Sequence, residues 1–507
     1  MEVNEEKTVY QTFTLSHQPT KVDIKYHQTE VEESGRAKYL GVVFDKKLTW
    51  KSHIEMIINK AQKRLSILKR MAGVQWGCNR NTLNTTYNMF IKPLFLYCCE
   101  PLITSSSAIL RKLDILQNQA LRLITGAVKT TPIQAMQILT HNRPLEETFR
   151  ERALCLYEKL IRLPDTPYWR EYDVQTPRVL KTQVGFVQEV LKYREEFNIP
   201  DCAQMIIPPM NPVKNVSFDG RLELNTHIQK STTSDEELKA IALETIHSRY
   251  PRPEWQHIYT DGSRLSIESN AGAGVHSDLF SFYATLGPNT THFDGEIEAI
   301  RISLEYLVEI CNQLQRVVIL SDCASAIQAI TRYGTPESMA IESCRYSLSL
   351  LRTRGVETVL QWIPSHCGIF GNEKADELAK KGTYILQSTQ REIPLGSAVR
   401  LIKNMLKVRY EKQVTDSTSH KNWIQGIHDI PDNPRYKAVA AFRLLTGHDC
   451  LAKHLNRFGI FGSPNCVLCR ETVDMDGDHL LKCAVLSGRD VYARYWNCRR
   501  LMMQMNF

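Results

Sequence analysis

Hydrophobic positions change their period several times between Trp255 and Gly382. Three short runs with glycine turns, HIYTDGSR, AGAGVHSD and FSFYATLG, predict three consecutive strands. Helical and strand-like patterns follow in the order HFDGEIEAIRISLEYLVEICNQ, RVVILSD, CASAIQAITRYG, PESMAIESCRYSLSLLRTRG, ETVLQWIPSH and NEKADELAKKG. This order predicts an α/β domain over residues 251–385, with a mixed five-stranded sheet and helices packed on it.

The segments on either side have different patterns. Residues 8–45 look extended, and the stretch that follows repeats at a helical period, with one apolar face formed by Ile54, Ile57, Ile58, Ala61, Leu65 and Leu68. Further helices complete a mainly helical part over residues 1–165. Prolines at positions 208, 209 and 212 indicate a linker region over residues 166–250. The pattern over residues 386–507 predicts a second helical region, which ends in a Cys/His cluster.

Basic residues concentrate in the first of these parts. Residues 1–150 contain 21 Lys and Arg against 13 Asp and Glu, whereas the remainder of the chain is balanced. Clustered basic side chains replace the counterions of nucleic-acid phosphates. The candidates for such contacts are Lys46, Lys47, Lys51, Lys60, Lys63 and Arg64. A solvated helical face that is rich in lysine is the alternative, and charge alone does not decide between them.

Composition restricts the class of protein. With 43% hydrophobic and 23% charged residues, the chain is typical of a globular protein. It contains no apolar run of about 18 residues, so no membrane span is expected. The polar start MEVNEEKTVYQ does not have the pattern of a secretory signal. Most of the fourteen cysteines are scattered, which indicates reduced thiols in an intracellular protein of the nucleus or the cytoplasm.

Four carboxylates stand where apolar strands end or helices begin. Asp261 follows IYT, Asp322 follows VVILS, and Glu296 and Asp376 lie in the first turns of helices. Each alone is more simply a turn residue or a helix-terminal charge. Four neighbouring carboxylates would repel one another unless cations neutralised them, and oxygen ligands select Mg²⁺ or Mn²⁺. Glu298, about 200° round the helix from Glu296, is expected to be a solvated charge.

The segments YTDGS, FDGEIEAI, VILSD and WIPSHCGIFGNEKADELA make the pattern more specific. In order, spacing and flanking residues they resemble ribonuclease H of the cellular and retroelement type. The resemblance implies the ribonuclease H-like fold, two bound Mg²⁺ ions and cleavage of the RNA strand of RNA–DNA hybrids. By position it assigns the metal ions to Asp261, Glu296, Asp322 and Asp376, and assistance with proton transfer and product release to His366. Cys323 stands where relatives commonly have Ser. Without the resemblance, His366 would be interpreted as a loop histidine that bonds the backbone.

The basic first part carries a second resemblance. YLGVVFDKKLTWKSHI followed by paired helices resembles the end of a reverse transcriptase and its thumb in non-LTR retrotransposons. Polymerase chemistry in that family needs adjacent aspartates, and this chain contains no Asp-Asp pair. We therefore expect a retrotransposon-derived fragment without polymerase activity that keeps a ribonuclease H endonuclease. A catalytically inactive relic that binds nucleic acid is the alternative. Two other nucleases of the same fold are disfavoured. Exonucleases need Asp-x-Glu on the first strand, where this chain has Asp-Gly-Ser. Integrases use a late Glu, whereas the late acid here is Asp376.

The last cluster has the spacing Cys466-x2-Cys469-x9-His479-x3-Cys483. Three thiolates and one imidazole at these spacings can build a tetrahedral Zn²⁺ site. Similar Cys/His tails follow the ribonuclease H domain in the retroelements that the chain resembles. With all four ligands supplied by protein, the site would be structural and would assist nucleic-acid binding. The alternative is four residues that hold no metal.

Overall fold

A computed structural model describes residues 4, 8–14, 22–164, 184–211, 216–227, 233–266, 269–385, 391–469 and 471–505. Contacts divide the chain into two compact units. The first, here called the helical unit, comprises Met1–Ala153, Pro177–Tyr193 and Leu406–Phe507. The second, here called the sheet unit, comprises Leu154–Thr176 and Arg194–Met405. Parts of the expected linker, residues 165–183, 212–215 and 228–232, lie outside the described residues.

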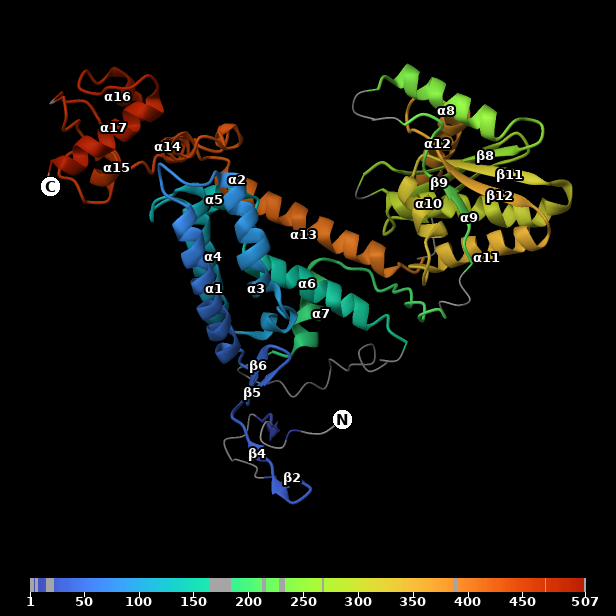
Figure 1. Cartoon of the computed structure of the whole chain (residues 1–507), viewed down its shortest axis with the longest axis horizontal. Helices are drawn as coiled ribbons and strands as arrows, with labels where there is room; N and C mark the ends of the chain where they lie inside the picture. The colour runs from blue at the N-terminus through green and yellow to red at the C-terminus, as the bar shows by residue number, and fades with distance from the viewer. Residues whose placement is uncertain are drawn as a thin grey trace. The chain divides into compact units, whose positions relative to one another are not determined.

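The sheet unit contains the α/β pattern that the sequence predicts (Figure 1). Its elements are β7 (Asp219–Arg221), α8 (Asp235–Arg249), β8 (Gln256–Arg264), β9 (Ala271–Ser277), β10 (Ser281–Gly287), α9 (His292–Ile310), β11 (Arg316–Ser321), α10 (Ala324–Thr331), α11 (Met339–Thr353), β12 (Glu357–Trp362) and α12 (Phe370–Thr383).

One mixed sheet organises this unit, in the strand order β10-β9-β8-β11-β12-β7. The first three strands are antiparallel neighbours, and β8, β11, β12 and β7 run parallel. The predicted α/β class and the five predicted strands are confirmed. The sixth strand, β7, comes from the expected linker. It is three exposed residues, DGR, that pair with β12 through their backbone, so they leave no hydrophobic period to detect.

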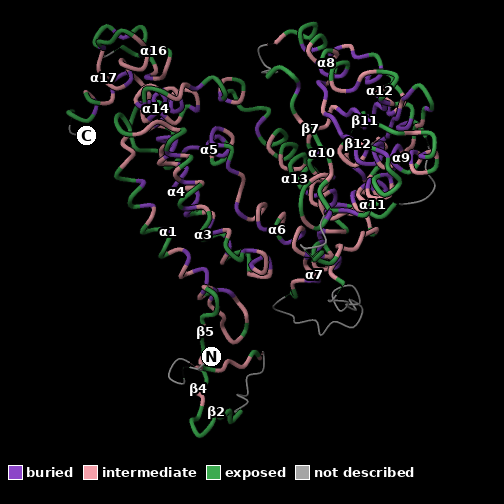
Figure 2. Tube along the Cα trace, turned by 45° about the vertical axis from the view of Figure 1, so that its right-hand side comes forward, coloured by how far each residue is buried: buried purple, intermediate pink, exposed green. Residues whose placement is uncertain are grey.

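Helices cover both faces of the sheet (Figure 1). Alternate strand residues point to opposite faces, so Ile319 joins the core under α9, α10 and α11, whereas Leu320 joins the core under α8 and α12. Strand β11 is buried along all but its first residue, and its neighbour β12 is buried at Val359, Leu360 and Gln361 (Figure 2). Helix α8, from the expected linker, buries Leu238, Ala242 and Ile246 and is therefore an integral layer of the unit.

The helical unit combines the two ends of the sequence. Its first part contains β1 (Val9–Tyr10), β2 (Lys25–Tyr26), β3 (Thr29–Glu30), β4 (Glu32–Glu33), β5 (Arg36–Tyr39), β6 (Val42–Asp45), α1 (Lys51–Met71), α2 (Arg80–Thr86), α3 (Lys92–Leu96), α4 (Ser107–Thr125) and α5 (Ile133–Thr140). Its last part contains α14 (Arg435–Thr446), α15 (Ala452–Arg457), α16 (Gly477–Lys482) and α17 (Val491–Gln504). Three helices run from one unit into the other: α6 (Leu145–Leu160), α7 (Phe186–Glu196) and α13 (Leu395–Thr418).

Two buried arginines of α14 join these ends. Arg435 donates hydrogen bonds to the carbonyl oxygens of Leu123 and Ile124, and Arg443 donates to that of Gly126. These carbonyls lie at the C-terminus of α4, where helix geometry leaves them without intrahelical partners. The regions 1–165 and 386–507, predicted as separate parts, thus contribute to one core. Among the described residues, no helix combines the length and apolarity needed to cross a membrane.

Candidate active site

Asp261 lies in the middle of β8, between β9 and β11. The sequence pattern placed it at a strand end, but β8 continues to Arg264 through pairing with β9. Asp261 is 5% exposed, and Gly274 is its partner on β9. A carboxylate at this depth is costly unless it is neutralised.

Glu296 reaches the same place from α9. The helix begins with a capping box, in which Thr291 and Asp294 each bond the other's backbone N–H. Gly262 brings the helix close to β8, because a Cβ atom there would lie 2.4 Å from the backbone nitrogen of Glu296. Glu296 is fully buried, and neither of its carboxylate oxygens has a hydrogen-bond partner among the described residues. The Nδ1 atom of His292, at 3.7 Å from Oε1, is too distant for one.

Asp322 follows the last residue of β11, as predicted. The indole N–H of Trp362 donates to its backbone carbonyl at 3.0 Å, and the side-chain amide of Asn372 donates to Oδ2 at 3.2 Å. Asn372 lies in the first turn of α12, which begins at Phe370. Its carbonyl oxygen Oδ1 is buried and has no hydrogen-bond partner in the part of the chain that the structure describes, which fits a residue that faces a polar ligand site.

Asp261, Glu296 and Asp322, here called the acid cluster, offer carboxylate oxygens that lie within 4.8 Å of one another. Burial, followed by the charges of Asp322 and Asp376, raises the pKa of Asp261. Burial, followed by the charge of Asp261, raises the pKa of Glu296 well above its usual value. Both shifts have the same physical cause, since burial and neighbouring carboxylates disfavour a further negative charge. Its oxygen-only donor set, with two unpartnered oxygens on Glu296, fits hard divalent cations.

Asp376 stands next to this cluster rather than inside it. It lies on α12 and adds to the charges that raise the pKa of Asp261. Its Oδ2 atom accepts an ion pair from Lys380 at 2.5 Å, four residues further along the same helix. The structure therefore gathers three of the four predicted acids and places the fourth beside Asp261 with its own lysine partner.

His366 lies in the loop between β12 and α12. The residue is exposed, and its backbone has the left-handed conformation, with φ of 54°. A turn of this kind lets a side chain project from the end of a strand. The structure does not include His366 in the acid cluster, so its role in proton transfer or product release stays a prediction.

The expectation for Glu298 is wrong. The residue does face away from the acid cluster, but it is 4% exposed and not solvated. Arg301 donates to both of its oxygens at 2.8 Å, and Arg391 donates to Oε1 at 2.7 Å. Burial opposes ionisation, yet these two arginines outweigh it and hold the pKa of Glu298 below its usual value. Arg391 lies 93 residues from Glu298 in the sequence, so helical spacing does not indicate their contact.

Replacement of Glu298 with Gln is expected to lower the free energy of unfolding by about 1–3 kcal/mol, because it leaves two arginines without their shared partner. Since the pKa is lowered in the folded state, this stabilisation is present at neutral pH and is lost as the pH falls through the folded-state value. Thermal unfolding at pH 7 and in acid measures both effects. Glu305→Gln removes an exposed partner of Arg301 and serves as the control, with an expected change below about 0.5 kcal/mol. Equal losses in the two variants would contradict the assignment.

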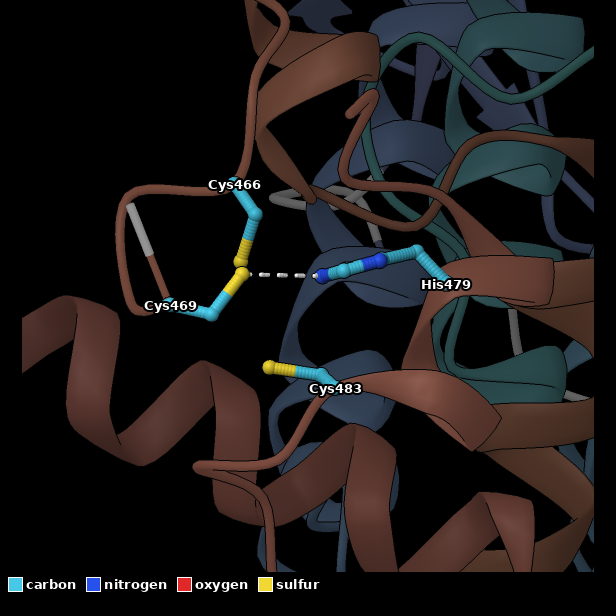
Figure 3. A group of neighbouring side chains, drawn as sticks. All are labelled: Cys466, Cys469, His479 and Cys483. Carbon is cyan, nitrogen blue, oxygen red and sulfur yellow. Dashed lines mark hydrogen bonds between the residues drawn. The ribbon is translucent and has the colours of Figure 1, made fainter. Parts of the chain in front are cut away.

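Cys466, Cys469, His479 and Cys483 do come together, with donor atoms within 4.8 Å of one another (Figure 3). The two cysteines of the loop face His479 on α16 and Cys483 directly after it (Figure 3). Sγ of Cys469 lies 3.4 Å from Nε2 of His479. Asp476 caps α16 by accepting from the backbone N–H of His479, so the helix start positions the imidazole. The donor set matches a closed tetrahedral zinc site.

The six predicted phosphate contacts fall into two groups. Lys47, Lys51, Lys60 and Lys63 are exposed. Lys46 pairs with Glu33 at 2.6 Å, and Arg64 lies over the ring of Phe90, 4.4 Å from its centroid. Two of the six are thus engaged within the protein, and the others lie on or just before α1, whose opposite face packs inward. Their role in binding nucleic acid stays a prediction.

Comparison with known proteins identifies the region that carries the acid cluster. The RNase H family model matches residues 253–384. These residues are a ribonuclease H domain. Over 132 residues the chain is 27% identical to the probable RNA-directed DNA polymerase from transposon BS of Drosophila melanogaster. Over 125 residues it is 28% identical to the retrovirus-related Pol polyprotein from type-1 retrotransposable element R1 4 of Nasonia vitripennis.

These similarities have limited extent. Each alignment covers 25% of this chain, and the aligned part spans 14% of the first relative and 31% of the second. Among solved structures, RNase H1 from the halophilic archaeon Halobacterium salinarum NRC-1 is 19% identical, with 96% of that chain and 25% of this one covered and a TM-score of 0.21. The family model matches residues 253–384 only, so the resemblance of residues 1–165 to a reverse transcriptase thumb stays a prediction.

Sequence reasoning missed two residues of the ribonuclease H domain that contact its acids. The hydrogen bond from Asn372 to Asp322 joins residues 50 positions apart, so no local spacing indicates it. Lys380 was not singled out, although its spacing of four residues from Asp376 is a recognisable signal for a helical ion pair.

Proposed function

We propose that the ribonuclease H domain is an endonuclease that hydrolyses the RNA strand of RNA–DNA hybrids. The observation that carries this proposal is the acid cluster, in which three carboxylates converge and both oxygens of the buried Glu296 lack hydrogen-bond partners within the described ranges. Asp261, Glu296, Asp322 and Asp376 would hold two Mg²⁺ or Mn²⁺ ions. Such ions, when bound, activate water and stabilise the leaving oxygen of a phosphodiester. Both relatives are named as products of transposable elements, which supports this substrate class.

The domain's own residues prepare the site. Gly262 lets α9 approach β8 so that Glu296 reaches the carboxylate of Asp261. Asn372 donates a hydrogen bond that orients Asp322, and Lys380 forms an ion pair with Asp376. His366, exposed on its loop, would be free to exchange a proton with the product as it leaves. For the Cys/His cluster we infer a structural Zn²⁺ ion, because three sulfurs and one nitrogen complete its four ligands.

Cleavage of a labelled RNA–DNA hybrid by the full chain in Mg²⁺ tests the function. Asp322→Asn, which keeps the side-chain shape, is expected to abolish detectable cleavage because it removes the negative charge that would hold a metal ion at the end of β11. Glu377→Gln, an exposed neighbour of Asp376 on α12, is the matched control and should cleave like the wild type. Cleavage that survives Asp322→Asn would refute the proposal. Hybrid binding without any cleavage by the wild type would instead support the inactive, nucleic-acid-binding alternative.

A further inference from the structure

We propose that the helical unit binds single-stranded nucleic acid in a cleft between α17 and the turn formed by residues 72–78. The cleft, here called the α17 cleft, has a volume of about 600 Å³. Its lining includes Gln75, Trp496, Asn497, Arg499, Arg500 and Gln504. None of these residues belongs to the ribonuclease H domain or to the Cys/His cluster.

One face of α17 forms the first wall. The cleft is lined by α17 positions 493, 496, 497, 499, 500, 503 and 504, whose helical spacing places them on one broad face of the helix. The other face, with Tyr495, Cys498 and Met502, is buried against Cys466 and Cys483. Arg494 also donates to the carbonyl oxygens of Leu480 and Leu481 at the end of α16. The wall is therefore fixed to the Cys/His module and presents a constant set of side chains.

The turn of residues 72–78 forms the second wall. The backbone N–H of Gly73 donates to Trp76 and that of Cys78 donates to Met71, each at 3.0 Å, which closes the turn on α1. Arg435 of α14 donates to the carbonyl oxygen of Gly73 at 3.0 Å. Trp76, next to the lining residue Gln75, is 63% exposed. Its indole lies over Gly73, where a Cβ atom would be 2.4 Å from Nε1. The turn thus contributes Gln75 to the lining of the cleft, and the residue that follows it in the chain, Trp76, is an exposed aromatic ring.

The chemistry of the lining selects the ligand. Two arginines and no carboxylate line the cleft, so it attracts anions. Arg499 is anchored to the carbonyl oxygen of Cys450 at 2.7 Å, whereas Arg500 is exposed. The amides of Gln75, Asn497 and Gln504 can both donate to and accept from base edges. An unpaired strand offers phosphates to the arginine, base faces that can stack on an indole and base edges that can bond the amides. In a duplex the base faces are stacked on one another and cannot reach Trp76.

Fluorescence anisotropy of the full chain with labelled oligothymidylate and oligouridylate, without divalent cations, tests this inference. Arg500→Ala is expected to weaken binding about tenfold and to reduce the slope of log affinity against log salt by about 0.7, the value for one lost phosphate contact on a single strand. Trp76→Ala is expected to weaken binding at least about fivefold through lost stacking. Lys112→Ala, which removes an exposed charge on α4 outside the cleft, should change affinity less than about twofold.

Unchanged affinity in both Arg500→Ala and Trp76→Ala would overturn the inference, as would equal losses in Lys112→Ala. Duplex DNA that binds as tightly as the single strands and depends equally on Arg500 would also overturn it. Gln504→Glu adds a negative charge at an exposed position without removing packing, so it must weaken binding even if a truncated side chain perturbs folding. A preference between the two oligonucleotides identifies the strand type, and either preference upholds the site.

Discussion

Asp261→Asn is expected to lower the rate of RNA cleavage at least about a thousandfold and, in the absence of divalent cations, to make the protein more stable. The first effect is expected because Asp261 belongs to the acid cluster and also interacts with Asp376. A thousandfold lower rate corresponds to the loss of several kcal/mol of cation-mediated stabilisation of the transition state, about 1.4 kcal/mol for each factor of ten. The second follows because the wild type buries a carboxylate, 5% exposed, against Asp322 without a compensating cation. A neutral amide of the same shape removes that repulsion.

Single-turnover cleavage of a labelled hybrid and thermal unfolding measure the two effects. We expect the melting temperature without divalent cations to rise by about 2–4 °C in Asp261→Asn, which corresponds to roughly 1 kcal/mol for a unit of this size. Added Mg²⁺ should stabilise the wild type by binding only the folded state and should stabilise the variant much less. Glu377→Gln, with its exposed carboxylate on α12, should match the wild type in both assays. A variant that loses activity and also loses stability would indicate that Asp261 has a structural rather than a metal-binding role.

The elements of the ribonuclease H domain were predictable because their signals are local. The run RVVILS is buried along five of its six residues and forms the centre of the sheet, as a continuous apolar segment should. Asp322 directly follows that run, so its position at a strand end needed no tertiary information. Asp261 was harder to place, because pairing of Gly262 and the next two residues with β9 extends β8 beyond the carboxylate.

What the sequence did not predict depends on contacts between distant segments. The burial of Glu298 requires Arg391, which approaches from beyond the last helix of the domain. The joining of α14 to α4 requires Arg435 and Arg443, which reach carbonyl oxygens more than 300 positions away. The sequence indicated that both regions are helical, but a helical pattern carries no information about which helices pack together. The α17 cleft has the same origin, since its two walls come from opposite ends of the chain.

Loss of metal from the Cys/His cluster is expected to cause the largest change in stability. The cluster connects the loop of Cys466 and Cys469 to α16, and the buried core behind it contains Leu480, Met475 and Tyr495 but few regular backbone pairs. A structural Zn²⁺ ion in such a small module supplies much of its folding free energy. We therefore expect one zinc ion per purified chain, and removal of it to cost the helical unit about 5 kcal/mol or more.

Two cysteines of the same core separate metal binding from packing. Cys483→Ala removes a ligand, so it should abolish the zinc content measured by elemental analysis and shift thermal unfolding as strongly as a chelator does. Cys498→Ala removes an equally buried thiol that is not a ligand, so it should keep the zinc and cost only about 1–2 kcal/mol from the cavity. The chelator should then destabilise Cys498→Ala as much as the wild type but leave Cys483→Ala unaffected. If both variants lost zinc equally, or if the purified chain contained none and ignored the chelator, the four residues would be a packed thiol and histidine cluster without a metal.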